Sequence, residues 1–216
     1  MTVKVNLKRL EKDIIAIEQK PVQKGKILFY GDSCFRRWNA ANGNTPLEEA
    51  IPGTLNHGFG SATTEEMLYY YPRAVRPYEP KIMVIKSFGN DMIFGYTPEE
   101  VLDLQQRLIA YARTDFPDVR FFMMAPLYNY GNYPKFPNFN KDRLVYDQML
   151  KEYVDKQEDM TFVRVMDDAR FTVDGKTGPD AIIRRELFID DGIHFNKDGY
   201  DLFADFWKKI LGDLVE

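Results

Sequence analysis

Short apolar runs alternate along the chain with longer segments in which apolar residues recur at helical spacing. The apolar runs predict buried strands at residues 26–30, 53–59, 81–87, 120–125 and 161–166. The segments between and after them predict helices at about 62–76, 97–113, 139–157 and 197–214. Parallel neighbours in a sheet need long crossover connections, which helices normally supply. The alternation therefore predicts an α/β fold with a mostly parallel sheet and helices on both faces.

A further amphipathic helix is predicted near the N-terminus, at about 4–20. The apolar residues of this segment lie close to helical spacing, at Val5, Leu7, Leu10, Ile14 and Ile17. We expect this helix to pack on the body of the protein through that apolar face.

Two capping signals support the predicted helix boundaries. Thr97 is followed by Pro98 at the first helical position and by Glu100, which together form a capping box. Asn196 is a suitable N-cap for the last helix.

Composition places the chain among ordinary globular proteins. Of its 216 residues, 44% are hydrophobic and 29% charged, and no linker-like stretch divides them, so we expect a single domain spanning 1–216. The formal net charge of −4 argues against a nucleic-acid surface, which would need clustered Lys and Arg. No apolar run approaches the roughly 20 residues that span a bilayer, and the N-terminus lacks the layout of a signal peptide. These features predict a cytoplasmic protein without a membrane span.

Small or polar residues follow several of the predicted strands. Residues 31–33 (Gly-Asp-Ser) follow the first strand, 58–61 (Gly-Phe-Gly-Ser) the second and 89–91 (Gly-Asn-Asp) the third. The segment 189–195, which contains an aspartate and a histidine, comes after the fifth strand and a loop. Ligands of open parallel sheets bind at the carboxyl ends of the strands. We therefore expect these four segments to meet at one edge and to carry the chemistry.

Ser33, His194 and Asp191 are candidates for nucleophilic catalysis. His194 follows Asp191 by three residues, a spacing that lets one turn bring the carboxylate to the imidazole. A carboxylate on Nδ1–H fixes the tautomer and stabilises the imidazolium that forms when Nε2 takes a proton. A serine hydroxyl needs such a base to act as a nucleophile at neutral pH, and His194 could serve Ser33. The structural alternatives are a surface turn with an incidental histidine and a strand-to-helix turn with a polar cap.

Neighbouring residues receive other assignments. Cys34, the single cysteine, is an alternative nucleophile, although buried cysteines are usually small core residues. Asp32 should bond loop backbone, and Asp190 is a poorer partner for His194 because its adjacent position changes the direction of its side chain. His57, within the second predicted strand, should pack or line a pocket.

Hydrogen-bond donors for an oxyanion are available at the same edge. Asn90 offers a side-chain amide, and the 58–61 loop offers backbone N–H groups. Removing one such donor from a tetrahedral intermediate costs roughly 3 kcal/mol. The structural alternatives are an Asx turn at Asn90 and a tight connection in the glycine loop. The coincidence of all these features at one sheet edge favours catalysis.

The motifs "ILFYGDS", "NHGFGSATTEEMLYYY", "SFGND" and "FIDDGIHFNKDGY" occur in this order between about Lys26 and the C-terminal helix. The order resembles that of the SGNH hydrolase superfamily, the GDSL esterases and lipases, and in particular small bacterial platelet-activating-factor acetylhydrolase-like esterases. The resemblance implies a three-layer α/β/α, flavodoxin-like fold with a five-stranded parallel sheet. It also implies hydrolysis of carboxylic esters, including acetyl groups on lipids and sugars, without a metal or other cofactor.

The same resemblance implies a catalytic triad and an oxyanion hole. Ser33 would be the nucleophile, His194 the base and later the acid, and Asp191 its orienting partner. The oxyanion would be bound by the Asn90 amide and by the backbone N–H groups of Ser33 and Ser61. Ser61 stands where the family usually has glycine, and Gly60 is the fallback donor.

The segment 126–140 carries five aromatic residues among Pro, Asn and Gly, which predicts a long loop. Its Tyr128, Tyr130 and Tyr133 are candidate substrate contacts, and packing over the sheet edge is the structural alternative. The leading hypothesis is a serine esterase that acts on small-molecule esters, namely short-acyl or acetyl esters of lipids or carbohydrates, through an acyl-enzyme. The alternative is a catalytically silent module of the same fold that binds a glycan or lipid through this loop.

Overall fold

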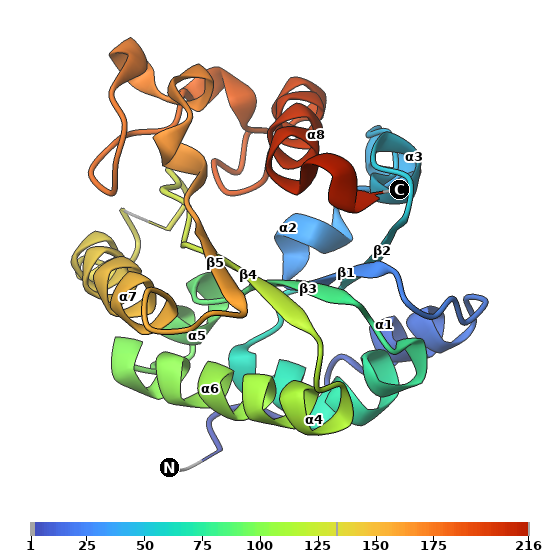
Figure 1. Ribbon diagram of the computed structural model, residues 1–216. Coiled ribbons are helices and arrows are strands. Elements are labelled where there is room, and N and C mark those ends of the chain that lie inside the picture. Colours follow the sequence, from blue (N-terminus) through green and yellow to red (C-terminus); the bar gives the residue numbers. More distant parts are fainter. Residues whose placement is uncertain (1–2, 133, 216) are drawn as a thin grey trace.

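The computed structural model describes residues 3–132 and 134–215, and at its centre is a five-stranded parallel sheet (Figure 1). The strands lie in the order β2-β1-β3-β4-β5. Their bounds are β1 Ile27–Gly31, β2 Thr54–Gly58, β3 Ile82–Lys86, β4 Arg120–Met124 and β5 Met160–Val163. The predicted parallel α/β sheet is confirmed.

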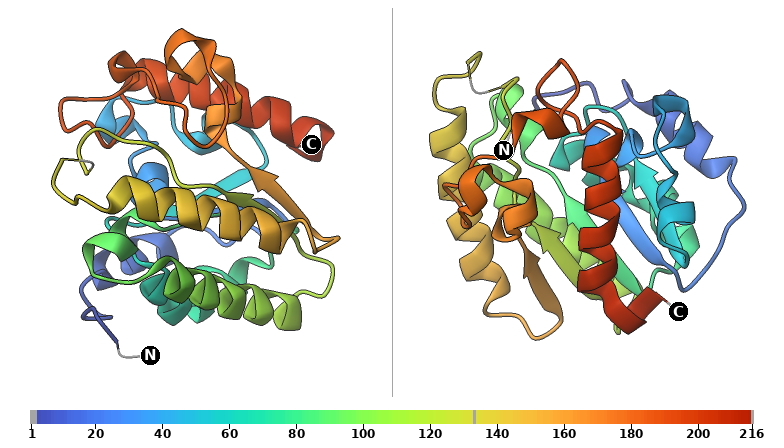
Figure 2. Two further views of the ribbon diagram at one scale, coloured as in Figure 1. Left: turned by 90° about the vertical axis from the view of Figure 1, so that its left-hand side faces the viewer. Right: turned by 90° about the horizontal axis from the view of Figure 1, so that it is seen from above.

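Helices cover both faces of the sheet (Figures 1 and 2). One face carries α1 Glu11–Glu18, α4 Thr64–Ala74, α5 Gly89–Ile93, α6 Pro98–Asp115 and α7 Phe139–Val154. The other face carries α2 Ser33–Arg36, α3 Leu47–Ala50 and α8 Lys197–Leu211. Short 3₁₀ helices complete the chain: η1 Ala40–Asn42, η2 Arg76–Tyr78, η3 Val165–Asp167, η4 Ala169–Phe171, η5 Val173–Gly175, η6 Arg185–Leu187 and η7 Gly212–Val215. The three layers are those expected for this fold class.

The side chains of β1 alternate between two apolar cores. Leu28 and Tyr30 enter the core beneath α4 and α6, whereas Ile27 and Phe29 enter the core beneath α8. All four are fully buried. A strand that is buried on both faces has no polar side, which explains why residues 26–30 form a continuous apolar run.

Both predicted helix caps are confirmed. The Thr97 hydroxyl accepts the N–H of Glu100 at 3.3 Å, and the Glu100 carboxylate accepts the N–H of Thr97 at 2.9 Å. The Asn196 side chain accepts the N–H of Gly199 at 3.0 Å and so starts α8.

The N-terminal helix is shorter than predicted: α1 spans Glu11–Glu18 and not 4–20. Asn6 begins a separate turn, in which its side chain accepts the N–H of Lys8 and its carbonyl accepts the N–H of Arg9, both at 3.0 Å. Local side-chain bonding of this kind competes with helix formation.

The last strand also ends earlier than predicted, at Val163 and not at residue 166. Arg164 donates to Asp147 of α7 at 2.9 Å and to Asp167 at 3.2 Å. These bonds fix the chain in a turn at this point, and the segment that follows forms 3₁₀ helices.

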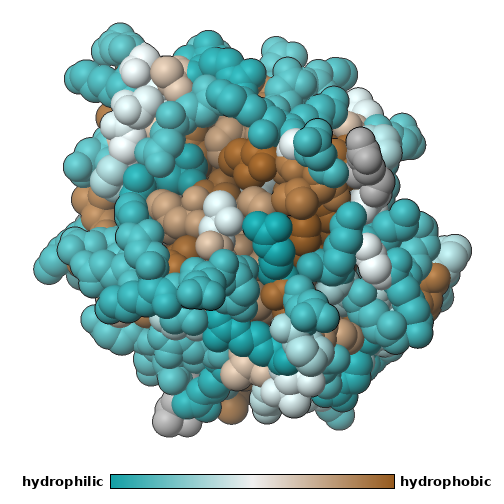
Figure 3. Space-filling model, in the orientation of Figure 1, coloured by the Kyte–Doolittle hydropathy of each residue, from teal (hydrophilic) through white to brown (hydrophobic). Residues whose placement is uncertain are grey.

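The face of the molecule seen in Figure 3 is mostly hydrophilic, with apolar side chains gathered in a hollow between α8 and the sheet. Phe162, Val163, Phe206 and Ile210 line a pocket there. Within the described part of the chain, no helix is long and apolar enough to cross a membrane.

Candidate active site

The turn after β1 places Ser33 at the first position of α2. The Asp32 carboxylate accepts the N–H of Cys34 at 2.9 Å and so caps this short helix. Gly31 has no room for a side chain, because a Cβ there would lie 2.6 Å from the carbonyl oxygen of Lys86 in the adjacent strand. The tight turn therefore requires glycine, and it leaves Ser33 partly exposed at the carboxyl end of the sheet.

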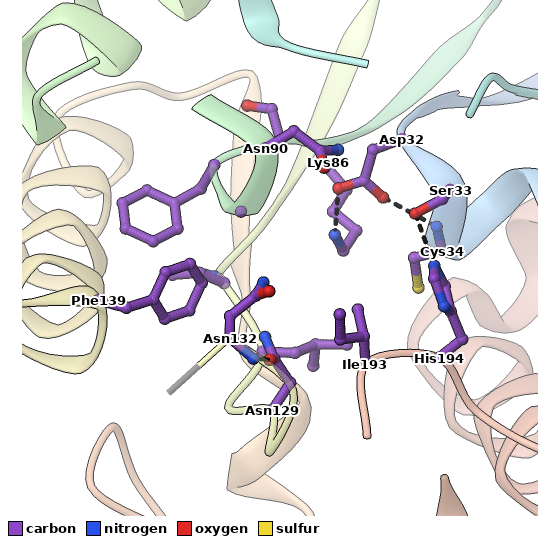
Figure 4. Close-up of a pocket in the computed structure, with 15 residues that line it drawn as sticks. Asp32, Ser33, Cys34, Lys86, Asn90, Asn129, Asn132, Phe139, Ile193 and His194 are labelled. Atoms are coloured by element: carbon purple, nitrogen blue, oxygen red, sulfur yellow. Dashed lines mark hydrogen bonds and ion pairs between the residues drawn. The ribbon is translucent and has the colours of Figure 1, made fainter. Parts of the chain in front are cut away.

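His194 lies in hydrogen-bond contact with Ser33, which is 161 positions away in sequence (Figure 4), and with Asp191 of its own turn. His194 Nε2 lies 2.9 Å from Ser33 Oγ, and His194 Nδ1 lies 2.6 Å from Asp191 Oδ2. The carboxylate fixes the proton on Nδ1, which leaves Nε2 as the acceptor for the serine hydroxyl. The three side chains therefore have the arrangement of an activated serine.

The Asp191 carboxylate is itself held by the turn that carries the histidine. Its Oδ1 accepts the backbone N–H groups of Ile193 at 2.8 Å and of His194 at 3.0 Å. Partial burial alone would raise the pKa of Asp191, but the bonds from His194 and Ile193 outweigh it and the pKa is lowered. The group is therefore ionised at neutral pH.

Helix α8 fixes the position of the histidine turn relative to Ser33. The Tyr200 hydroxyl of α8 donates to the carbonyl of Cys34 at 2.8 Å. The N–H of Ile189 donates to the carbonyl of His194 at 2.9 Å, which closes the turn before α8. The segments that carry His194 and Ser33 are thus joined by the bond from Tyr200 as well as by the bond between their own side chains.

The predicted oxyanion donors other than Ser33 lie in α5 and in the loop after β2. Asn90, in α5, lines the same pocket as Ser33, and its Nδ2 donates to the carbonyl of Ala62 at 3.0 Å. That bond ties α5 to the loop after β2. An amide nitrogen carries two hydrogens, so one remains for a ligand. Neither Gly60 nor Ser61 is among the residues that line the pocket.

The hydrogen bonds of the 59–62 loop distinguish Ser61 from Gly60. The N–H of Gly60 donates to the Asp13 carboxylate at 2.9 Å, and the N–H of Ala62 donates to the carbonyl of Phe59 at 3.4 Å. The N–H of Ser61 has no acceptor among the residues that the structure describes. Ser61 also has a φ of 56°, in the left-handed region that favours glycine. Of the two donors considered from sequence, only Ser61 keeps a backbone N–H available.

The backbone is strained at Phe88, two residues before Asn90. Phe88 has a φ of 112°, a conformation that side-chain-bearing residues rarely adopt. The buried carboxylate of Asp91 accepts the N–H of Phe88 at 3.0 Å and the N–H of Thr64 at 2.7 Å. Burial raises the pKa of Asp91 to about 7, partly opposed by the bonds from Thr64 and Phe88. Asp91 thereby holds the strained turn against the start of α4.

A small pocket of about 50 Å³ opens beside Ser33 and His194 (Figure 4). Its polar lining includes Lys86, Asn129 and Asn132, which the sequence did not single out. Lys86 could have been found from the sequence, because it is the one charged residue of an otherwise apolar strand and lies at the strand's carboxyl end. The two asparagines lie in the predicted loop, where nothing distinguished them from other polar loop residues.

Two of the predicted substrate tyrosines, Tyr128 and Tyr130, are not among the residues that line this pocket. The Tyr130 hydroxyl donates to the carbonyl of Ile183 at 2.6 Å, and its ring meets that of Tyr128 edge to face at 5.3 Å. Tyr133 lies outside the described residues. The 126–140 loop reaches the pocket through other side chains.

Cys34 and His57 have environments unlike that of Ser33. Burial raises the pKa of the Cys34 thiol to about 12, so it remains protonated at neutral pH. His57 is fully buried, with Nδ1 2.7 Å from the carbonyl of Ala74, and burial lowers its pKa to about 4. A protonated thiol and a buried neutral imidazole are poor candidates for the nucleophile and the base.

Among residues 3–132 and 134–215, no three His, Cys, Asp or Glu side chains lie close enough together to hold a metal ion.

Comparisons with known proteins point to one family. Residues 29–202 match the model of a family described as GDSL-like lipase/acylhydrolase. Among curated proteins, the search found no match.

Solved structures share the fold along nearly the whole chain. A Streptococcus pneumoniae protein with the provisional name platelet activating factor is 21% identical, with a TM-score of 0.75 over 97% of this chain and 94% of its own. A GDSL-like lipase from Bacteroides thetaiotaomicron is 16% identical, with a TM-score of 0.70 over 97% and 98%. The catalytic domain of peptidoglycan O-acetyltransferase A from Streptococcus pneumoniae is 20% identical, with a TM-score of 0.59 over 88% and 94%. At these identities the likeness is one of fold.

Proposed function

Because the chain belongs to the GDSL-like lipase/acylhydrolase family and is therefore a hydrolase, we propose that it is a serine esterase that cleaves short-acyl carboxylic esters through an acyl-enzyme. The observation that carries the proposal is the continuous hydrogen-bonded chain from Ser33 Oγ through His194 to Asp191, with distances of 2.9 and 2.6 Å. A serine that merely capped a turn would not need an imidazole on its hydroxyl.

The mechanism follows from this chain of bonds. His194 Nε2 takes the hydroxyl proton as Ser33 Oγ attacks the ester carbonyl, and Asp191 stabilises the imidazolium that forms. The imidazolium then gives the proton to the leaving alcohol. In the second half-reaction, His194 takes a proton from water, the water attacks the acyl-enzyme, and Ser33 recovers its proton as the carboxylic acid leaves.

Three donors are available for the oxyanion of each tetrahedral intermediate. Two belong to residues that line the pocket: the N–H of Ser33, which has no acceptor among the described residues, and the second amide hydrogen of Asn90. The third is the N–H of Ser61, which is not among the lining residues. Donors that are fixed before the reaction need no reorganisation when the charge develops. The bond from Asn90 to Ala62 supplies that rigidity by joining the two loops.

The dimensions of the pocket support a short acyl group. The acyl group stays on Ser33 until water releases it, so it must fit beside the serine, whereas the alcohol can extend into solvent. A pocket of about 50 Å³, walled by Phe139 and Ile193, suits an acetyl or slightly larger group. Acetyl-group chemistry also appears in the name of the similar peptidoglycan O-acetyltransferase.

The silent binding module is the less favoured alternative. This hypothesis assigns substrate contact to the tyrosines of the 126–140 loop. Tyr128 and Tyr130, however, pack against one another and are not among the residues that line the pocket. The hypothesis also gives no reason for the bonds among Ser33, His194 and Asp191.

The test is hydrolysis of p-nitrophenyl acetate by the unaltered chain, Ser33→Ala and Cys34→Ser. We expect activity to be lost in Ser33→Ala and retained in Cys34→Ser. A fluorophosphonate probe should label the unaltered chain at Ser33, because only an activated serine reacts. Equal hydrolysis by Ser33→Ala and the unaltered chain would refute the proposal, and loss of activity in Cys34→Ser together with labelling at Cys34 would reassign the nucleophile.

A further inference from the structure

The pocket beside Ser33 contains polar side chains that the ester-hydrolysis chemistry does not use. Lys86, Asn129 and Asn132 are 8%, 8% and 5% exposed, and all three line the pocket. Burying polar groups in a pocket for a plain alkyl chain would be unfavourable, because each group loses its bonds to water. Their presence therefore indicates that the substrate offers them a hydrogen-bonding group.

The side-chain amide of Asn132 has no hydrogen-bond partner among the described residues, and Figure 4 shows it directed into the cavity toward Lys86. The side-chain oxygen of Asn129, Oδ1, accepts the backbone N–H of Asn132 at 2.8 Å. The Nδ2 of Asn129 makes no hydrogen bond within the described part of the chain. The two asparagines thus present amide groups with unused donor capacity.

The loop that carries the asparagines is fixed relative to the catalytic turn. The N–H groups of Tyr130 and Gly131 both donate to the carbonyl of Gly192, at 2.8 and 3.1 Å. Gly131 packs so closely that a Cβ there would lie 2.3 Å from Ile193. Asn132 follows directly, so its position relative to His194 is set by backbone bonds and not by a freely moving loop.

Lys86 supplies a fixed cation on the opposite wall. Its Nζ donates to Asp32 Oδ2 at 2.6 Å, and two of its hydrogens remain for other acceptors. Burial disfavours the charged form, but Asp32 outweighs it, so the pKa of Lys86 is raised and the ammonium is retained. The Lys86–Asp32 pair is electrically neutral overall, which favours a neutral acceptor over a second carboxylate.

We propose that this pocket selects acyl groups that carry a neutral oxygen acceptor beyond the ester carbonyl, such as an ether or hydroxyl oxygen bound by Asn132 and Lys86. The inference rests on the proposed esterase function and names its substrate class. The oxygen belongs to the acyl part of the ester. The acyl part stays bonded to Ser33 after acylation, whereas the alcohol part departs in that step and needs no enclosed pocket.

The experiment compares two acyl groups of the same length. p-Nitrophenyl methoxyacetate and p-nitrophenyl butyrate differ only in an ether oxygen that replaces one methylene. Each kcat/KM is divided by the rate constant for hydrolysis by hydroxide, which removes the intrinsic reactivity of the ester. We expect the corrected ratio to favour methoxyacetate by about tenfold, the value of one net hydrogen bond to a buried or charged donor.

Asn132→Leu tests the assignment, since leucine keeps the size of asparagine and removes its hydrogen bonds. The matched control is Asn138→Leu, which makes the same change at an exposed position of the same loop, where the side chain caps no helix. We expect the corrected ratio to fall about fivefold or more in Asn132→Leu and to stay unchanged in Asn138→Leu. Hydrolysis of p-nitrophenyl acetate, whose acyl group carries no such oxygen, should stay unchanged in Asn138→Leu.

The outcomes separate the two proposals. Acetate hydrolysis that persists in Ser33→Ala overturns the esterase mechanism itself. An active, Ser33-dependent enzyme with a corrected ratio of one, or with a ratio that Asn132→Leu leaves unchanged, overturns the acyl selectivity alone. If Asn132→Leu fails to fold, Asn129→Leu and Lys86→Met give the same comparison, and an unchanged ratio in both overturns the inference.

Discussion

The Asp13 carboxylate of α1 accepts the backbone N–H of Gly60 at 2.9 Å, and so joins the N-terminal helix to the loop that supplies a candidate oxyanion donor. The second oxygen of Asp13 accepts from Arg36, at the end of the helix α2 that begins with Ser33, at 3.0 Å. Arg9 donates to the carbonyl of Ser61 at 2.6 Å. The segment before residue 29 lies outside the match to the family model, yet it contacts both the loop after β2 and the helix that begins with Ser33.

We expect Asp13→Ala to lower kcat for p-nitrophenyl acetate by about tenfold, with KM changed less than twofold, because a displaced donor weakens binding of the transition state and not of the ester. Amide hydrogen exchange should become faster at residues 59–62. The measurements are steady-state kinetics and exchange followed by mass spectrometry.

The matched control is Arg73→Ala. Arg73 donates to Glu11 at 2.7 Å and to Glu18 twice at 2.7 Å, so it also attaches α1 to α4, but it does not touch the loop. We expect nearly unchanged kcat in this variant. An equal fall of kcat in both variants would show that α1 contributes only general stability.

Asp191→Asn should lower kcat by about a thousandfold or more while leaving the fold intact. The substitution keeps the size of the side chain, but an amide nitrogen facing Nδ1 favours the wrong tautomer of His194 and cannot stabilise the imidazolium. Pre-steady-state acylation with p-nitrophenyl acetate measures the effect directly. A loss smaller than tenfold would mean that Asp191 is not the partner that orients the base.

Phe88→Gly should unfold at higher urea concentration than Phe88→Ala. Both substitutions remove the ring, which stacks on Tyr146 at a centroid distance of 4.8 Å. Only glycine relieves the φ of 112°, and we expect it to be more stable than alanine by about 1 kcal/mol. At an unstrained position alanine is the more stable of the two. Equal or greater stability of Phe88→Ala would show that the turn carries no strain.

His57 should make the protein less stable in acid. Burial lowers its pKa from 6.5 to about 4, so the folded state favours the neutral ring. The stabilisation is complete above pH 6.5 and is lost as the pH falls toward 4, by about 3 kcal/mol in the free energy of unfolding. In His57→Gln this part of the pH dependence should be absent. Urea unfolding of both proteins between pH 7 and pH 4 tests it, and parallel curves would contradict the assignment.

The sequence was sufficient to predict the parallel sheet and most of its helices. It was also sufficient to predict that the members of the candidate triad meet at one edge of that sheet. That was possible because most strands are apolar runs and because the motifs around Ser33, Ser61 and Asn90 each come soon after a strand. The contact of Asp13 with the loop after β2 could not be predicted, because an aspartate on the polar face of a helix normally faces water. The positive φ of Phe88 also gave no signal, because such a conformation is usually marked by glycine. Both features depend on contacts between segments that are far apart in the chain.

Ser33 and His194 are separated by 161 positions, and α8, which follows the histidine, contacts the helix that begins with the serine. The contact between Ser33 and His194 therefore cannot form until the strands between them have paired and α8 has docked. Closing a contact of such long sequence separation is among the late and slow steps of folding. During refolding, we expect ester hydrolysis to return no earlier than the last phase seen by tryptophan fluorescence. A partly folded chain would carry an inert serine, and the enzymatic rate would count only fully assembled molecules.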